Sequence, residues 1–155
     1  MTLNLPHPDA ATQQMRLLAD FRYALRRFLQ FSEQAAVKVG LHPQQHQLLL
    51  QVAGVSEGVT PTVAYIAERL GLRHHSVVEL SIRCEEAGLI RRAHDPVDRR
   101  CVVLRLTLEG SRLLENLSRD HARELNELGP QLVASLKHIR AVDKPRAQAG
   151  ATESA

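Results

Sequence analysis

Apolar residues recur at helical spacing along most of this chain. From Met15 to Val39 they stand three or four positions apart, which predicts a first helix from about Thr12 to Lys38. Gly40 is suited to close this helix as the residue after its last turn. The helix is near the upper end of the usual globular length, so we expect it to pack against something besides its own small domain.

Three shorter helices are predicted next. Pro43 suits the first position of a helix through HPQQHQLLLQVAG. Thr62 is placed to cap a third helix, VAYIAERL, which stops at Gly71. A fourth helix is expected from about His74 to Ala87, before Gly88. Its inward stripe is predicted to consist of Val77, Leu80, Cys84 and Ala87.

The spacing then changes from a helical to a strand pattern. Leu89–Arg92 and Cys101–Leu106 are β-prone runs on either side of HDPVDRR, which is a hairpin signal. Thr107 is placed to cap a fifth helix, which we expect to break at Gly129 and Pro130 before a last helix. A helix pair with a tight turn followed by an Arg-tipped hairpin is a winged helix-turn-helix. The predicted fold class is therefore mainly α with a small β-wing.

Composition narrows the class of protein. The chain has 155 residues and a net charge of +3, so the placement of its charges matters more than their sum. No apolar stretch approaches the roughly 20 residues that span a bilayer. The N-terminus lacks a basic leader and an apolar core, and only Cys84 and Cys101 are available for disulfides. We therefore expect a cytoplasmic protein with no membrane partner.

Two segments carry a specific family resemblance. They are LGLRHHSVVELSIRCEEAGLI and RRAHDPVDRRCVVLRLTLEG, with an acidic turn that ends in Arg-Arg and a strand that ends in LTLEG. Together they resemble the core of the MarR (multiple antibiotic resistance regulator) family of bacterial transcription regulators, over roughly residues 12–140. The resemblance implies a homodimer built from the first and the last two helices. It also implies a small-molecule or redox signal that alters operator affinity.

The domain organisation follows from the helix order and this resemblance. Residues 1–11 are expected to be flexible, and 41–107 to form the winged helix-turn-helix DNA-binding domain. Residues 12–40 and 108–140 are expected to be dimerisation helices, and 141–155 a disordered tail.

The fourth helix is the predicted recognition helix. Its outer face offers side chains to the major groove, and Arg73 precedes it where relatives often have a capping Ser. His and Ser near the helix start can donate to phosphate or base edges. Val78 is suited to a thymine methyl, and Glu79 to cytosine N4 or to repelling a wrong sequence. The predicted DNA-binding residues of this helix are Arg73, His74, His75, Ser76, Val78, Glu79 and Arg83.

The hairpin supplies the second predicted contact. Arg99 and Arg100 are the candidates for the minor groove or phosphate, and Asp98 is expected to support an arginine, either Arg83 or Arg100. One arginine is expected to be held internally while the other reaches outward. The sequence leaves open whether Arg99 or Arg100 is the arginine that reaches outward.

Other polar and aromatic residues give weaker signals. His42 and His46 have the spacing of a helical metal pair, but no third ligand is visible, so we expect no metal and no cofactor. His74 and His75 are adjacent in the predicted fourth helix, so their side chains point in different directions and they are a poor metal-binding pair. Whether Cys84 or Cys101 senses oxidants stays open. An aromatic set on the first helix could line a ligand pocket, with plain core or dimer packing as the alternative: Phe21, Tyr23, Phe28 and Phe31.

The sequence thus favours a DNA-binding transcription regulator, expected to be a repressor. It would bind a pseudo-palindromic operator in double-stranded DNA as a homodimer, and a small molecule or other signal would modulate it. The alternative is a winged-helix protein-interaction module without DNA binding. No P-loop, nucleophile elbow or dinucleotide fingerprint is present, so we expect no enzyme. The operator sequence, the effector and the regulated genes are not readable from the sequence.

Overall fold

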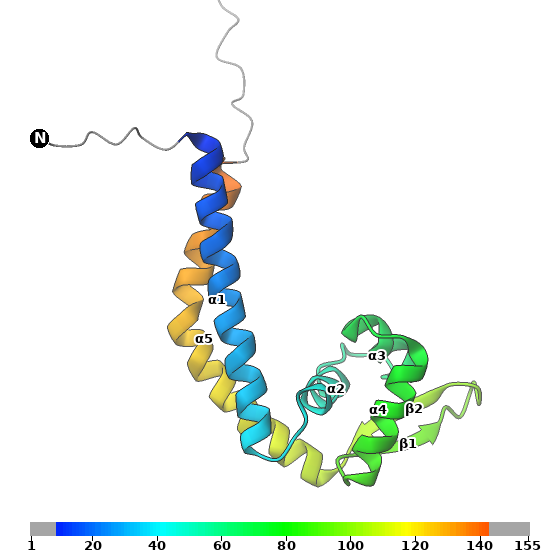
Figure 1. Ribbon diagram of the computed structural model, residues 1–155. Coiled ribbons are helices and arrows are strands. Elements are labelled where there is room, and N and C mark those ends of the chain that lie inside the picture. The colour runs from blue at the N-terminus through cyan, green and yellow to red at the C-terminus, as the bar shows by residue number, and fades with distance from the viewer. Residues whose placement is uncertain (1–8, 143–155) are drawn as a thin grey trace, which may run out of the picture. The chain divides into compact units, whose positions relative to one another are not determined.

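A computed structural model describes residues 9–142 of the chain. Its elements, in order, are α1 (Ala10–Lys38), α2 (Pro43–Ala53), α3 (Val63–Leu70), α4 (His74–Glu86), β1 (Ile90–His94), β2 (Val102–Leu106) and α5 (Leu108–Val142) (Figure 1). The predicted fold class, mainly helical with a two-stranded wing, is confirmed. No helix among residues 9–142 combines the length and apolarity needed to cross a membrane.

The chain divides into two compact units. We call Gln30–Arg123 the winged unit, because it holds α2, α3, α4 and the hairpin. The second, the long-helix unit, comprises residues 9–29 and 124–142 of the described chain. Both α1 and α5 pass from one unit into the other.

The core of the winged unit is built around α2. Leu48 and Leu49 of α2 are completely buried, and α2 packs against α3, α4 and β2. Burying one such side chain stabilises the folded state by about 1.5–3 kcal/mol. Val52 of α2 also belongs to this cluster, and the other elements all contribute to it, with Ala36, Ile66, Val77, Leu80, Cys84, Ile90, Leu104, Leu114 and Leu117.

Helix ends in the winged unit follow the sequence signals. Pro43 opens α2, and the Thr62 hydroxyl accepts a hydrogen bond from the Tyr65 N–H at 3.1 Å at the start of α3. Gly71 closes α3 in the left-handed region, with φ of 63°, which a residue with a Cβ rarely adopts. The turn between α3 and α4 therefore depends on this glycine.

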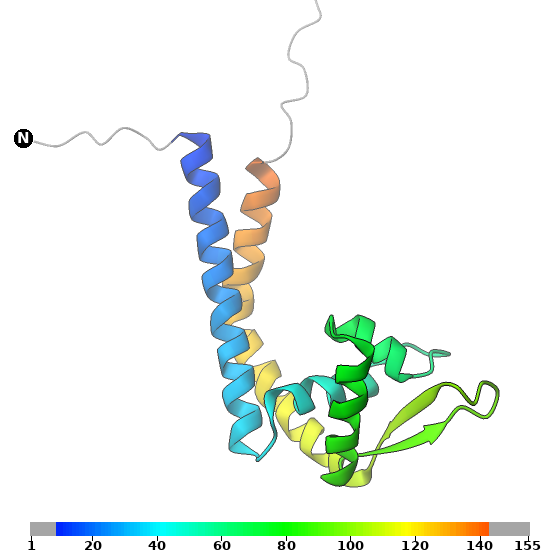
Figure 2. The same ribbon diagram turned by 45° about the vertical axis from the view of Figure 1, so that its right-hand side comes forward.

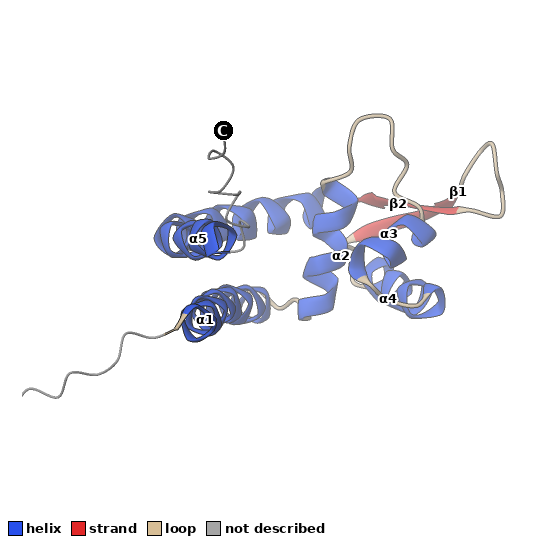
Figure 3. Ribbon diagram, turned by 90° about the horizontal axis from the view of Figure 1, so that it is seen from above, coloured by secondary structure: helices blue, strands red, loops and turns tan. Residues whose placement is uncertain are grey.

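The hairpin is antiparallel and its register is fixed by burial. Ile90 pairs with Leu106 and Arg92 with Leu104, so one face packs on the helices (Figure 3). The loop before α3 extends this sheet, because the Leu104 N–H donates to the Pro61 carbonyl at 2.9 Å. The base of the wing is thus tied to the start of α3, a contact that the sequence pattern did not indicate.

Thr107 joins the wing to α5. Its hydroxyl donates to the Gly88 carbonyl at 2.6 Å and accepts from the Gly110 N–H at 3.1 Å, which confirms it as the predicted cap. Gly110 lies so close to the chain before β1 that a Cβ there would stand 2.1 Å from the Leu89 carbonyl oxygen. Only glycine permits this approach of α5 to the end of α4.

The predicted break at Gly129 and Pro130 is wrong, because α5 is one helix with Pro130 inside it. Proline removes one helical hydrogen bond and disfavours helical geometry in the residue before it, largely through that residue's Cβ. Gly129 has no Cβ, so helical geometry in the residue before Pro130 is much less disfavoured. The helix therefore continues, and the expected last two helices are one.

Smaller differences concern helix ends and the buried face of α4. Residues 10 and 11 are helical and not part of a flexible terminus; residues 1–8 and 143–155, which include the predicted tail, lie outside the described residues. Ala87 is exposed because α4 ends at Glu86, and Ser81 takes its place in the buried stripe. The Ser81 hydroxyl donates to the Val78 carbonyl at 2.7 Å, which makes its burial tolerable.

Candidate DNA-binding surface

One side of α4 faces away from the core of the winged unit. At roughly 100° per residue, the buried residues Val77, Leu80, Ser81 and Cys84 define the inner side, and the opposite line runs through His75, Glu79, Ile82 and Glu86. All four residues of that line are exposed. We call them the outer line of α4.

The predicted recognition residues lie on or beside this line. His74, His75, Glu79 and Arg83 are exposed, whereas Ser76 and Val78 are half-buried at its flanks. Ile82 is 37% exposed and was missed by sequence reasoning, although its spacing of three from Glu79 was a usable signal. Val78 also packs against the core cluster, so the side chain most accessible for a thymine methyl is Ile82.

The N-terminus of α4 has no side-chain cap. Arg73 occupies the N-cap position in an extended conformation and makes no capping hydrogen bond. The first-turn N–H groups are therefore left without a side-chain acceptor, at the positive end of the helix dipole. Such a helix end favours a phosphate oxygen.

The hairpin loop is an ordered turn built by two aspartates. One carboxylate oxygen of Asp95 accepts from the Val97 and Asp98 N–H groups at 2.8 and 2.9 Å. The Cys101 N–H donates to the Asp98 carbonyl at 2.9 Å, and Nδ1 of His94 lies 2.8 Å from the Arg99 carbonyl. These bonds fix the backbone that carries the arginines. Figure 2 shows the loop extending beyond α4.

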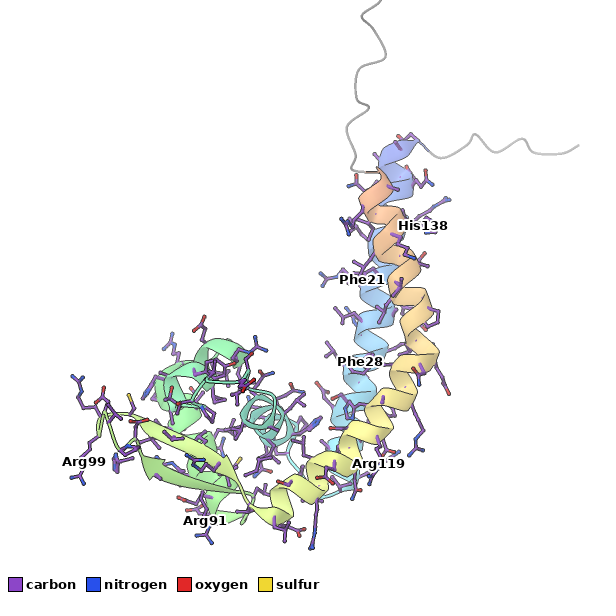
Figure 4. The ribbon with its side chains drawn as sticks, turned by 180° about the vertical axis from the view of Figure 1, so that it is seen from behind. Phe21, Phe28, Arg91, Arg99, Arg119 and His138 are labelled. Carbon is purple, nitrogen blue, oxygen red and sulfur yellow. The ribbon has the colours of Figure 1, made fainter. Side chains whose placement is uncertain are left out.

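Asp98 supports Arg100. The guanidinium of Arg100 donates to both carboxylate oxygens of Asp98, at 3.0 and 3.1 Å. These side-chain bonds, followed by one from the Arg100 N–H, hold the pKa of Asp98 below its usual value. The side chain of Arg99 has no hydrogen bond or ion pair within residues 9–142, and it points away from the wing (Figure 4). Between the two alternatives for Asp98, the structure shows Arg100 and not Arg83.

A second basic feature lies on the strands. Arg91 of β1 is the direct partner of Arg105 on β2, and both are exposed. Two like charges directly opposite each other destabilise a hairpin slightly. An external anion would relieve this repulsion. The sequence could not show the pair, because it depends on the register of the two strands.

The aromatic residues predicted for a ligand pocket are spread over both units. Tyr23 is 60% exposed, and Phe21 and Phe28 are half-buried in the long-helix unit, whereas Phe31 packs against the core of the winged unit. A groove of about 430 Å³ in the winged unit is lined by none of them but by His42, Gln44, Gln45, Leu80 and Arg83. The pocket stays a prediction.

The histidines of α2 do not act as a pair. Nδ1 of His42 accepts from the Gln44 N–H at 3.4 Å, in a capping box with Gln45, while His46 is buried at 3% exposure. In the described chain no three His, Cys, Asp or Glu side chains gather as metal ligands.

The two cysteines have different surroundings. Burial raises the pKa of the Cys84 thiol to about 11, so it packs as an apolar core residue. Burial, followed by the charge of Asp98, also raises the pKa of the half-exposed Cys101. Both thiols are therefore poor nucleophiles near neutral pH.

Comparison with known proteins places part of the chain in a known family model. Residues 39–100 match the model of the MarR family, which confirms the resemblance noted in the sequence. No curated protein sequence gives a significant match.

Several solved structures share the fold. AbsC, a MarR family transcriptional regulator from Streptomyces coelicolor, is 20% identical, with a TM-score of 0.68 over 93% of this chain and 96% of that one. A complex of S. aureus MepR with DNA is 24% identical, with a TM-score of 0.63 over 78% and 88%. Bordetella bronchiseptica BpsR, described as regulated in its DNA binding by 6-hydroxynicotinic acid, is 19% identical, with a TM-score of 0.59 over 80% and 90%.

Proposed function

We propose that this chain, which has a MarR family segment at residues 39–100 and the fold of MarR family structures, is a DNA-binding transcription regulator. It binds a pseudo-palindromic operator as a homodimer, represses transcription there, and responds to a small molecule or other signal. It acts in the cytoplasm, where bacterial operators lie.

The observation that carries this proposal is the pairing of α4 with the wing. The outer line of α4 is exposed beside a hairpin that presents Arg99 on an ordered turn, with no side-chain partner for Arg99 among residues 9–142. In our proposal α4 enters the major groove, with His75, Glu79 and Ile82 toward base edges. Arg99 then reaches the neighbouring minor groove or its phosphates.

Burial in the long-helix unit supports the homodimer. Large apolar side chains are exposed on both of its helices: Met15, Leu18, Leu25 and Leu29 on α1, and Leu125, Val133 and Leu136 on α5. An exposed apolar set of this size favours a second protein surface over water. A symmetric pair of copies would then place two recognition helices about one turn of DNA apart. Residues 12–40 and 108–140 are our proposed dimerisation helices, and 41–107 the proposed DNA-binding domain.

Support for an effector comes from a relative, since BpsR is described as regulated by 6-hydroxynicotinic acid. For this chain we propose only that a signal acts, and the aromatic residues Phe21, Tyr23, Phe28 and Phe31 are the candidates for its pocket.

Selection of bound duplexes from a random pool tests the proposal. We expect an enriched sequence with two inverted half-sites about one helical turn apart. The matched control is an Arg99→Ala, His75→Ala double variant, which should enrich the same sequence weakly or not at all. Failure of the native chain to enrich any duplex, at low as well as moderate salt, would reject DNA binding.

The second candidate is a protein-interaction module without DNA binding. Glu79 and Glu86 on the outer line favour it, because carboxylates repel phosphate. This reading predicts no duplex enrichment and a weak dependence of DNA affinity on salt. The selection experiment therefore separates the two candidates.

A further inference from the structure

Two histidines meet inside the winged unit, away from the proposed DNA surface. The rings of His46, from α2, and His121, from α5, lie 4.9 Å apart between centroids. Phe31 of α1 packs edge-on against His121 at 5.5 Å. Nε2 of His121 lies 2.8 Å from the Ser32 hydroxyl of α1, and Ser32 is 4% exposed. One cluster thus joins three helices.

The hydrogen bonds determine which nitrogen of His121 carries the proton. Nδ1 of His121 lies 2.6 Å from the Leu117 carbonyl oxygen. A carbonyl only accepts, so Nδ1 must be the donor, and in the neutral ring Nε2 is then the acceptor. The Ser32 hydroxyl therefore donates to Nε2. A proton on His46 would place a positive charge beside the His121 ring, whose centroid lies 4.9 Å away.

The surroundings of His46 give a positive charge little compensation. Burial, followed by repulsion from His121, lowers the pKa of His46 to about 4. Groups that face the cluster include the Ser32 hydroxyl and the Phe31 ring from α1, and the Leu117 carbonyl from α5. Among the described residues, no charged group of α3, α4, β1 or β2 contributes to this shift. His46 therefore folds in its neutral form.

We propose that Ser32, His46 and His121 form a proton-sensitive tie between α2, α1 and α5, and that acidification loosens it and weakens operator binding. The tie acts through α2, which packs against both α3 and α4. A shift of α2 changes the support under the recognition helix. The effect on operator binding rests on the function proposed above, whereas the effect on folding does not.

The lowered pKa of His46 determines how the stability of the fold changes with pH. A neutral His46 stabilises the fold above its unfolded pKa of about 6.5, and this stability is lost as the pH falls from there toward 4. Between about pH 7.5 and 5.5, the His46 contribution to the folding equilibrium constant should fall about tenfold. His74 and His75 lie exposed on α4, within the proposed DNA surface.

The test compares the native chain with His46→Leu at about pH 7.5 and 5.5, at one protein concentration. Unfolding in urea should show the tenfold loss in the native chain and little of it in the variant. Affinity for a selected duplex, relative to pH 7.5, should fall several-fold further in the native chain than in His46→Leu. Both proteins keep His74 and His75, so the comparison removes their effect.

Two further variants make the result decisive. His46→Gln also removes the titrating ring and replaces His46→Leu if that variant does not fold. His138→Gln removes an exposed histidine of α5 and should keep the native pH profile in both measurements.

Each outcome decides a separate claim. Equal pH profiles of unfolding in the native chain and the His46 variants would overturn the tie itself. A difference in unfolding but parallel pH profiles of DNA affinity would overturn its regulatory role. Absence of duplex binding at neutral pH would reject the proposed function, while the unfolding data would still judge the tie.

Discussion

The carboxylate of Asp98 gives the neighbouring arginines of the wing, Arg99 and Arg100, different roles. Asp98 holds Arg100 through two side-chain bonds, and Asp95 fixes the turn below it, so Arg99 is the arginine presented outward. On an exposed surface such bonds contribute little to stability. In the proposed complex with DNA, they order a short loop before it makes contact.

Replacing Arg99 and replacing Arg100 should therefore differ in effect. Arg99→Ala removes a direct phosphate contact in each subunit, so the slope of log affinity against log salt should become less steep by about 1–2 for the dimer. Arg100→Ala loosens the turn and should weaken binding with a smaller change in slope. Fluorescence anisotropy over a salt series measures both. Identical slopes for native chain and Arg99→Ala would remove Arg99 from the contact.

Glu79 should control discrimination between sequences. In Glu79→Gln the repulsion from phosphates disappears, so affinity for unrelated duplexes should rise several-fold, and the preference at one base pair of each half-site should relax. The control is Glu86→Gln on the same outer line, two turns further along α4, which should raise affinity without changing preference. Competition binding with single-base operator variants measures this. An unchanged preference in Glu79→Gln would place Glu79 outside the base contacts.

At the scale of elements, the ends of α2 and α3 and the wing agree with the sequence, and α5 does not. Pro43, Thr62 and Gly71 act locally, so their positions predict where helices begin and end. Gly129 and Pro130 together signal a break, but the missing Cβ of Gly129 lets α5 continue through Pro130. The strand register, which pairs Arg91 with Arg105 and ties β2 to Pro61, depends on contacts distant in sequence.

Continuity of α5 makes a testable claim about stability. Pro130→Ala restores a helical N–H and its hydrogen bond, so it should stabilise the protein by about 1–3 kcal/mol. The matched control is Gln131→Ala at the next exposed position, which should change stability by no more than about 0.5 kcal/mol. Urea unfolding at fixed protein concentration provides the values. A neutral or destabilising Pro130→Ala would indicate that the chain does break there.

At the scale of the whole molecule, the two units bury their apolar residues differently. The winged unit encloses a core drawn from α1, α2, α3, α4, the hairpin and α5. In the long-helix unit many apolar side chains stay exposed while Ala24 and Leu128 are buried. A second copy is the occupant that the proposed function requires for this surface.

Charged residues on that surface should separate the copies. Leu25→Glu with Leu29→Glu places carboxylates where we expect a second chain, so the variant should sediment as a monomer and bind operator at least tenfold more weakly. Leu50→Glu, at a similarly exposed position of α2, is the control and should leave the assembly state unchanged. A dimer that persists in the double variant would contradict the proposed interface.

The sequence by itself determined the order of helices and strands up to the start of α5, the caps at Thr62 and Thr107, and the position of α4 before a two-stranded wing. These features are local, because periodicity and capping act within a few residues. Tertiary structure alone decided which wing arginine is held, that Arg91 pairs with Arg105, and that His46 meets His121 across 75 positions of sequence. These features depend on burial and on contacts between distant segments, so the types and spacing of residues along the chain do not determine them.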